Sequence, residues 1–295
     1  MAEHVVFDNN AYKRIAPPRL AAIIAAERSR GVTALASMAV LQELFARARD
    51  PVNDQRGRNR AAIRKMGEHC RVTDGSRTSI NFLSHTDCQV YRLLTGAQHP
   101  DDTERFDLAA DLIRVITEAS VDDPLLSIAM PLDAVQRTVE AVESEYVHDL
   151  QQVAEGRTTN EPNLMKRNLE YAARVVRRTE AQYGAKFDLL RATGALVEVM
   201  KLTSVGFAVR DAVVAEMKAK GGGYGQHRNT VWDEEIMAAT SMYTTINGAP
   251  VIVVTEEERL LTAATVAKAS DRIFNIAAYE RLLGLAGTER RDADG

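Results

Sequence analysis

Cysteine and aromatic residues are scarce in this 295-residue chain, and each scarcity argues against a class of protein. The two cysteines, Cys70 and Cys88, are too few for a disulfide framework, and they form no CxxC pair of the kind found in zinc sites. Aromatic residues make up 5% of the chain, which argues against a base-stacking RNA platform. The histidines lack the HExxH spacing of zinc hydrolases. We expect both cysteines to be packing residues.

Long apolar runs and a secretion signal are also missing. No apolar run approaches the roughly 18 residues needed to span a bilayer, and residues 1–7 have neither the basic nor the apolar region of a signal peptide. Hydrophobic residues make up 45% of the chain and charged residues 26%, as in ordinary globular proteins. We therefore expect a soluble, cytoplasmic protein without membrane contact, built as one large domain or as a domain with an insertion.

The net charge of −4 at pH 7 conceals strong segregation along the chain. Residues 1–96 hold 15 basic and 9 acidic side chains, whereas residues 97–165 hold 4 basic and 15 acidic ones. The whole-chain charge therefore neither supports nor excludes binding of nucleic acid, and local patches decide. The acidic middle block would repel nucleic acid if it faced a nucleic-acid site.

The order of expected elements indicates an α/β protein with a parallel sheet. A strand at 5–7, a helix opened by Pro17-Pro18, a short strand at 32–36 and a helix at 38–49 form a strand–helix–strand–helix start. The pattern of apolar residues predicts helices through the middle of the chain, from 59 to 220, except that residues 72–95 give no clear pattern. A glycine run at 221–225 precedes a return to mixed pattern. Further expected helices are 59–70, 101–119, 131–155, 162–183, 186–220, 232–243, 258–268 and 278–285, with strands at 251–254 and 272–276.

Acidic residues follow the two most apolar strands of the expected sheet. Asp8 comes after the strand at 5–7, and Glu256 and Glu257 come after the strand at 251–254. Side chains just past the carboxyl ends of parallel strands share one crevice, which Glu43 and Asp233 can reach from helices. Clustered carboxylates persist mainly where a divalent cation offsets their charge. Each acid alone also fits a turn, a helix cap or a solvated helix position.

Four motifs in this order resemble those of the PIN-like nuclease family, and the closing strand at 272–276 fits the same pattern. They are Val6-Phe7-Asp8-Asn9-Asn10, Ser37-x-x-Val40-Leu41-x-Glu43-Leu44, Asp233-x-x-Ile236-x-Ala238-Ala239 and Val253-Val254-Thr255-Glu256-Glu257-x-x-Leu260. The resemblance implies a three-layer α/β fold with a central parallel sheet. Residues 1–96 and 221–295 would form this domain, and residues 97–220 a large all-helical insertion. The fourth acid of the family is usually Asp, and here it is a Glu.

The resemblance also implies a metal-dependent nuclease, more specifically an endoribonuclease-type hydrolase. Asp8 would be the central ligand of Mg²⁺ or Mn²⁺, with Glu43, Asp233 and Glu257 holding the metal directly or through water. A metal-bound water would attack the phosphodiester bond of RNA. Supporting hydrogen bonds would come from three further polar residues: Asn10, orienting the Asp8 loop or a water, and Ser37 and Thr255. The sequence leaves open whether Glu256 or Glu257 is the fourth ligand.

Basic residues after the second helix form a candidate nucleic-acid contact. They are Arg56, Arg58, Arg60, Arg64 and Lys65, which could grip a phosphate backbone or form a solvated helix face. A second cluster comprises Lys166, Arg167, Arg174, Arg177 and Arg178, and the glycine run at 221–225 could contact phosphate or act as a hinge.

Two other functional classes stay open at this point. One is a non-catalytic PIN-like module that binds RNA or a protein without cutting. The other is a helical interaction protein, in which the insertion binds a protein partner or a second copy of the chain and the α/β part is a scaffold. A haloacid-dehalogenase-type phosphatase needs a second Asp two residues after Asp8, and Asn10 occupies that place.

Overall fold

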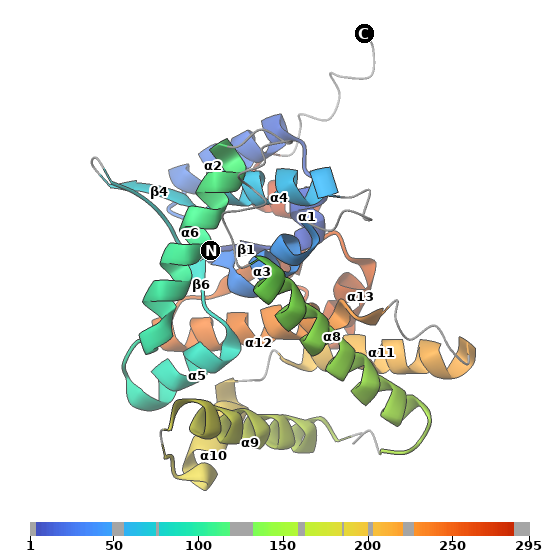
Figure 1. The fold of residues 1–295 in the computed structure, drawn as a ribbon. Coiled ribbons are helices and arrows are strands. Elements are labelled where there is room, and N and C mark those ends of the chain that lie inside the picture. The colour runs from blue at the N-terminus through green and yellow to red at the C-terminus, as the bar shows by residue number, and fades with distance from the viewer. Residues whose placement is uncertain are drawn as a thin grey trace.

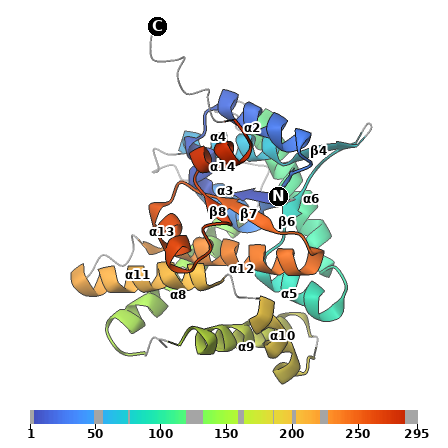
Figure 2. The same ribbon diagram turned by 180° about the vertical axis from the view of Figure 1, so that it is seen from behind.

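A four-stranded parallel sheet forms the centre of the fold in the computed structural model (Figures 1 and 2). Its order is β2 (Thr33–Ala34), β1 (His4–Phe7), β7 (Val251–Val254) and β8 (Ile273–Phe274), with every pair parallel. β7 is buried at all four positions, as expected for a strand covered on both faces. The expected parallel α/β sheet is confirmed. The structure describes residues 4–48, 56–74, 77–118, 132–158, 163–184, 186–199, 203–220 and 227–285.

The second expected strand, at 32–36, is split between two sheets. Leu35 donates its backbone N–H to the carbonyl of Val5 at 2.8 Å, and the chain then leaves the main sheet. β3 (Ala36–Ser37) pairs in parallel with β6 (Phe82–Leu83) instead. β4 (Arg71–Asp74) and β5 (Arg77–Ile80) form an antiparallel hairpin that projects from one side of the molecule in Figure 1. β4, β5, β6 and the helix α5 (Thr86–Thr95) account for most of the segment 72–95, in which we found no clear pattern.

Helices cover both faces of the main sheet. In both views α2 (Pro17–Ser29) and α4 (Arg56–His69) lie on one side of the sheet and α12 (Thr230–Asn247) lies on the other, and Figure 2 shows α14 (Ile276–Leu282) beside α4. The short helix α1 (Asn9–Arg14) directly follows β1, and α13 (Glu258–Val266) follows β7. α3 (Met38–Ala48) buries most of its residues between α4 and α12. Each strand of the central pair thus leads into a helix that begins at the same sheet edge.

A buried polar network fastens α1 to its neighbours. The hydroxyl of Tyr12 lies 2.9 Å from Nδ1 of His69, and Nε2 of His69 lies 2.7 Å from Oε2 of Glu27. Tyr279 donates its hydroxyl proton to Oε1 of the same glutamate at 2.8 Å. Cys70 is buried 3.5 Å from the Tyr12 hydroxyl, and burial raises the pKa of its thiol to about 12. Because each polar side chain has a partner, the network positions α1 without leaving unsatisfied groups.

The described part of the block 97–220 is helical, as predicted. It comprises α6 (Pro100–Glu118), α8 (Leu132–Ala154), α9 (Leu164–Tyr183), α10 (Leu189–Val199) and α11 (Ser204–Lys220), so the single helix expected at 186–220 is two helices. Ile113 of α6, Val139 of α8 and Val209 of α11 belong to the same hydrophobic core as Val6 of β1. α9 and α10 build a smaller core with α5 and α12. α6, α8 and α11 therefore share the core of the α/β part, whereas α9 and α10 pack mainly in the smaller core.

Within the described ranges, no helix combines the length and the apolar composition that crossing a bilayer requires.

Candidate functional site

A polar cavity of about 220 Å³ lies at the carboxyl ends of β1 and β7. All four predicted acids line it: Asp8 follows β1, Glu257 follows β7, Glu43 comes from α3 and Asp233 from the first turn of α12. The two strands are joined here, because the backbone N–H of Asp8 donates to the carbonyl of Val254 at 2.9 Å. The other lining residues are Asn9, Asn10, Lys13, Arg47, Asn229, Thr230, Ile236 and Arg259.

Asp8 is both a helix cap and a member of the acidic cavity. Its Oδ1 accepts a hydrogen bond from the backbone N–H of Ala11 at 2.6 Å, which caps α1. Its Oδ2 accepts one from the hydroxyl of Thr255 at 2.5 Å. Burial raises the pKa of Asp8 to about 7. The hydrogen bonds from Thr255 and Ala11 offset part of this shift, and the charges of Glu43 and Glu257 add to it.

Among the four acids, Asp233 has the fewest neighbouring groups that could offset its negative charge. Its carboxylate forms no hydrogen bond and no ion pair with any residue that the structure describes. Burial first, and then the charges of Asp8, Glu43 and Glu257, raise its pKa well above the ordinary value. A carboxylate in this position needs either a proton or a cation to offset its neighbours.

Three basic residues that we did not predict line the cavity beside the acids: Lys13, Arg47 and Arg259. Arg47 places its guanidinium 3.2 Å from Glu43, four residues earlier on α3. Burial raises the pKa of Glu43, and the charges of Arg47 and Lys13 and a hydrogen bond from Asn9 oppose that rise. Burial lowers the pKa of Lys13, which lies on α1 just past Asp8. The spacing of four between Glu43 and Arg47 was a signal in the sequence that could have identified the arginine.

The structure places Glu257, and not Glu256, in the acidic cavity. Oε1 of Glu256 instead accepts the backbone N–H of Ile276 at 2.9 Å, at the start of α14. Asn10 donates from Nδ2 to Oε2 of Glu257 at 3.0 Å. The amide of Asn10 thus holds the acid that follows the neighbouring strand β7. Our expectation that Asn10 orients the Asp8 loop or a water stays a prediction.

Of the two hydroxyl residues expected to support the site, one does so. Thr255 is fully buried, donates to Asp8 and accepts the backbone N–H of Glu257 at 2.9 Å, so it contacts two of the acids as a supporting residue would. Ser37 is buried at the end of β3 and does not line the cavity, and its hydroxyl has no hydrogen-bond partner within the described residues. The chain changes its pairing partner from β1 to β6 at this point.

The predicted basic contact on α4 does not form one surface. Arg58 is exposed, but Arg60 is 7% exposed and lies in the interior. Lys65 donates to two carbonyls at the end of α1, at 2.9 and 2.6 Å, and Arg64 donates to a carbonyl of α6 at 2.9 Å. Only the backbone of Arg56 is described. These residues fasten α4 to its neighbours because tertiary packing, and not charge, decides which face of a helix is covered.

The second basic cluster is also largely engaged within the protein. Arg167 pairs with Asp211 at 2.7 Å, and Arg178 pairs with Asp87 at 3.0 Å. Arg174 lies over the ring of Tyr171 on the same helix. The glycine run at 221–225 lies outside the described residues.

The donor set of the acidic cavity suits a hard divalent cation. Its acids and amides offer oxygen ligands, which Mg²⁺ and Mn²⁺ prefer. Oδ1 of Asn9 is buried and has no hydrogen-bond partner in the described part of the chain. In that same part, no three His, Cys, Asp or Glu side chains are spaced to hold an ion directly. An ion here would therefore keep water molecules between itself and some of the carboxylates, as Mg²⁺ commonly does.

Comparison of the chain with models of known families, with curated proteins and with solved structures finds no significant match.

Proposed function

We propose that this protein is a metal-dependent nuclease that hydrolyses phosphodiester bonds, with RNA as its substrate. The observation that supports this most is the convergence of Asp8, Glu43, Asp233 and Glu257 on one polar cavity at the edge of the parallel sheet. These residues come from four segments that are far apart in the sequence. Four carboxylates that line one cavity, two of them buried, repel one another, so the arrangement is costly unless a cation binds among them.

The acids and their supporting residues divide the work of holding Mg²⁺ or Mn²⁺. Asp8, at the carboxyl end of β1, would bind the ion together with Asp233, which lines the same cavity. Thr255 fixes the Asp8 carboxylate, and Asn10 fixes Glu257, so both acids enter the cavity in defined orientations. A bound divalent ion supplies a nucleophilic water at neutral pH and offsets charge on the leaving oxygen.

Basic side chains in the same cavity would bind the scissile phosphate. Lys13 forms no ion pair with a described residue and lies beside the acids on α1. Arg47 is engaged with Glu43, and Arg259 lies 3.3 Å from Glu216. We therefore assign the phosphate contact to Lys13, as a compact cation within reach of the metal. The preference for RNA over DNA follows only from the PIN-like resemblance of the sequence motifs.

The test is cleavage of an end-labelled, mixed-sequence single-stranded RNA in Mn²⁺, Mg²⁺ or EDTA, beside DNA of the same sequence. Asp8→Asn retains a residue able to cap α1 but removes the charge. We expect metal-dependent cleavage that this change lowers at least about 100-fold, the upper end for residues that merely support a metal. Glu258→Gln, on the exposed first turn of α13 beside Glu257, is the matched control and should leave cleavage unchanged.

The same proteins separate this proposal from the alternatives that the sequence left open. Absence of cleavage, with Mn²⁺ binding intact in calorimetry, would favour a non-catalytic RNA- or protein-binding module. Absence of Mn²⁺ binding as well would refute the metal site. Interaction with a protein partner that persists in Asp8→Asn would then direct attention to the helical part of the chain.

A further inference from the structure

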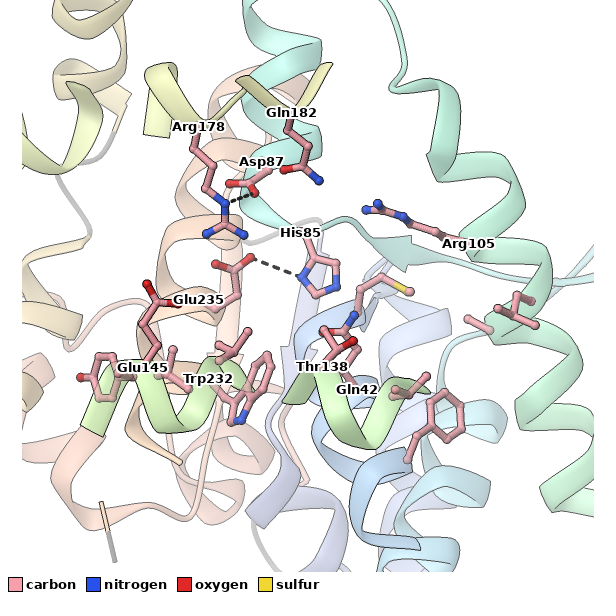
Figure 3. A pocket seen from close by; sticks show the side chains of 18 of the residues that line it. Gln42, His85, Asp87, Arg105, Thr138, Glu145, Arg178, Gln182, Trp232 and Glu235 are labelled. Carbon is pink, nitrogen blue, oxygen red and sulfur yellow. Dashed lines mark ion pairs between the residues drawn. The ribbon is translucent and has the colours of Figure 1, made fainter. Parts of the chain in front are cut away.

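A second and larger cavity lies on the side of α12 turned away from the acidic cavity. Its volume is about 650 Å³, within the range of small-molecule sites. α12 contributes Asp233 to the acidic cavity and Glu235 to this one, and residues two apart point to nearly opposite sides of a helix. The other walls come from α3, α6, α8, α9 and the start of α5. Figure 3 shows this cavity with His85 and Glu235 near its centre.

One wall of the larger cavity is apolar and can hold the body of an organic molecule. Trp232 lies at the base of the view in Figure 3, beside the helix that carries Glu145. Its indole N–H is already used, because it donates to the buried Glu143 at 2.9 Å. The tryptophan therefore offers this cavity only its ring. The other apolar lining residues are Met38, Phe45, Leu108, Ala109, Leu112, Val135, Val142 and Val231.

The centre of the cavity carries a histidine with one ring nitrogen unused. Nδ1 of His85 lies 3.4 Å from Oε1 of Glu235, and that oxygen also accepts the backbone N–H of Thr86 at 2.7 Å. Burial raises the pKa of Glu235, but the hydrogen bonds from His85 and Thr86 and the charge of His85 outweigh it and leave the pKa lowered. In the neutral imidazole, the ionised carboxylate selects the tautomer with its proton on Nδ1. Nε2 is then an acceptor, and it is buried without a hydrogen-bond partner among the described residues.

The charges around His85 leave an excess of acid. Arg178 pairs with Asp87 at 3.0 Å, and Arg105 pairs with Asp101 at 3.2 Å. Glu235 is occupied by His85 and Thr86. The charged lining residues that form no ion pair with any described residue are Glu145 and Asp149, one turn apart on the exposed side of α8. The cavity thus offers one unused nitrogen acceptor and two uncompensated carboxylates, and its cations are already paired.

We propose that this cavity binds an organic amine. Its apolar body would lie against Trp232 and the aliphatic wall, and its N–H groups would reach Nε2 of His85 and the carboxylates of Glu145 and Asp149. An ammonium group supplies donors and no acceptors, which matches what these residues lack. An organic anion would meet the two carboxylates without a free cation to offset them. This proposal does not depend on the nuclease activity, since the acidic cavity lies on the other side of α12.

Three probes with the same indole and the same two-carbon chain test the charge preference. They are tryptamine, with an ammonium group, tryptophol, with a hydroxyl group, and indole-3-propionate, with a carboxylate. Calorimetric titration of the full chain should give a millimolar or tighter dissociation constant for tryptamine. We expect tryptamine to bind at least about tenfold tighter than indole-3-propionate, with tryptophol between them. Equal or tighter binding of the anion, or no binding of tryptamine, overturns the proposal.

Variants assign the binding to this cavity. His85→Phe keeps a ring and removes the acceptor, and should weaken tryptamine about two- to tenfold, the value of one net hydrogen bond. His148→Phe, on the exposed face of α8, is the matched control and should change nothing. Because His85 is largely buried, Glu145→Gln with Asp149→Asn, both exposed, provides a change that does not threaten folding. This double variant should reduce the preference of the protein for tryptamine over tryptophol. Unchanged binding in both variants overturns the assignment.

Discussion

Replacing Thr255 with valine tests how the acidic cavity is held together. Thr255 is 0% exposed, and its hydroxyl joins the two central strands. It donates to Oδ2 of Asp8 at 2.5 Å and accepts the backbone N–H of Glu257 at 2.9 Å. Valine has nearly the same shape and neither function. The change therefore removes two hydrogen bonds from the cavity floor without opening a void.

The expected cost follows from the kinds of hydrogen bond that are lost. A bond to an ionised carboxylate contributes about 1.5–3 kcal/mol and a neutral one about 1 kcal/mol. We therefore expect Thr255→Val to lower the free energy of unfolding by about 2–4 kcal/mol at pH 8, where Asp8 is ionised. The loss should be smaller at pH 5.5, where Asp8 is mostly protonated. Because the Asp8 carboxylate also loses its fixed orientation, Mn²⁺ affinity should fall about 10- to 100-fold.

Urea unfolding at the two pH values and Mn²⁺ calorimetry measure these effects. Thr265→Val is the matched control, since Thr265 is exposed on α13 and its hydroxyl bonds only to the carbonyl of Leu261, at 3.2 Å. It should shift stability by less than about 0.5 kcal/mol. Thr255→Ser restores the hydroxyl and should restore Mn²⁺ affinity. The proposed supporting role of this hydroxyl is refuted if Thr255→Val binds Mn²⁺ as tightly as Thr265→Val. It is also refuted if Thr255→Ser binds Mn²⁺ as weakly as Thr255→Val.

Three further predictions concern pH, packing and the contact between α8 and the acidic cavity. Because the pKa of Asp8 is raised to about 7 in the folded state, this group's contribution to stability falls as pH rises from about 4 to about 7. Bound Mn²⁺ offsets that loss, so the rise in Tm caused by Mn²⁺ should be larger at pH 8 than at pH 5.5. Gly67→Ala should cost about 1–3 kcal/mol in urea unfolding, since its methyl would lie 2.4 Å from an isoleucine of α6, whereas Gly57→Ala, with open space around it, should not destabilise α4. Glu143→Gln weakens the hold on Arg47, which should then compete more for the acids, so Mn²⁺ affinity in calorimetry should fall severalfold.

The central sheet and its acids could be predicted because they depend on local patterns. The runs at 5–7 and 251–254 are apolar at every position, which is typical of strands buried on both faces. Each run is followed at once by polar residues. Parallel strands end at the same sheet edge, so Asp8 and Glu257 meet without any further information. Glu43 and Asp233 could be predicted as site residues only through the resemblance to the PIN-like motifs, because an acid on a helix is ordinarily solvated.

The basic residues of α4 show where such reasoning fails. Arg60 and Lys65 are residue types that usually lie on a solvated helix face. Arg60 instead lies in the interior, and Lys65 donates to the carbonyls at the end of α1. A long aliphatic stem lets such a side chain pack against apolar neighbours while its head reaches a polar group. The identity of that group depends on which helix lies opposite. The sequence does not contain this information in a local form.

The strands between residues 71 and 83 were missed for a different reason. β4 and β5 are exposed at most positions whose side chains are described, so no apolar alternation distinguishes them from a loop. β6 has two residues, too few for any period to be read. Its partner β3 continues a strand that began in the main sheet and ends at Ser37, which does not line the acidic cavity. Where this candidate residue lies therefore depends on a change of strand partner that no local pattern announces.

The helical part of the chain is connected to the acidic cavity through Glu143 of α8. Oε1 of this buried glutamate accepts from Arg47 and from the indole N–H of Trp232, both at 2.9 Å. Arg47 in turn lies against Glu43, and Trp232 is adjacent to Asp233 on α12. A displacement of α8 would thus alter two of the four acids at once. Since α8 also forms a wall of the larger cavity, an amine bound there would contact the same helix, and we expect tryptamine to change Mn²⁺ affinity in the native protein but not in Glu143→Gln.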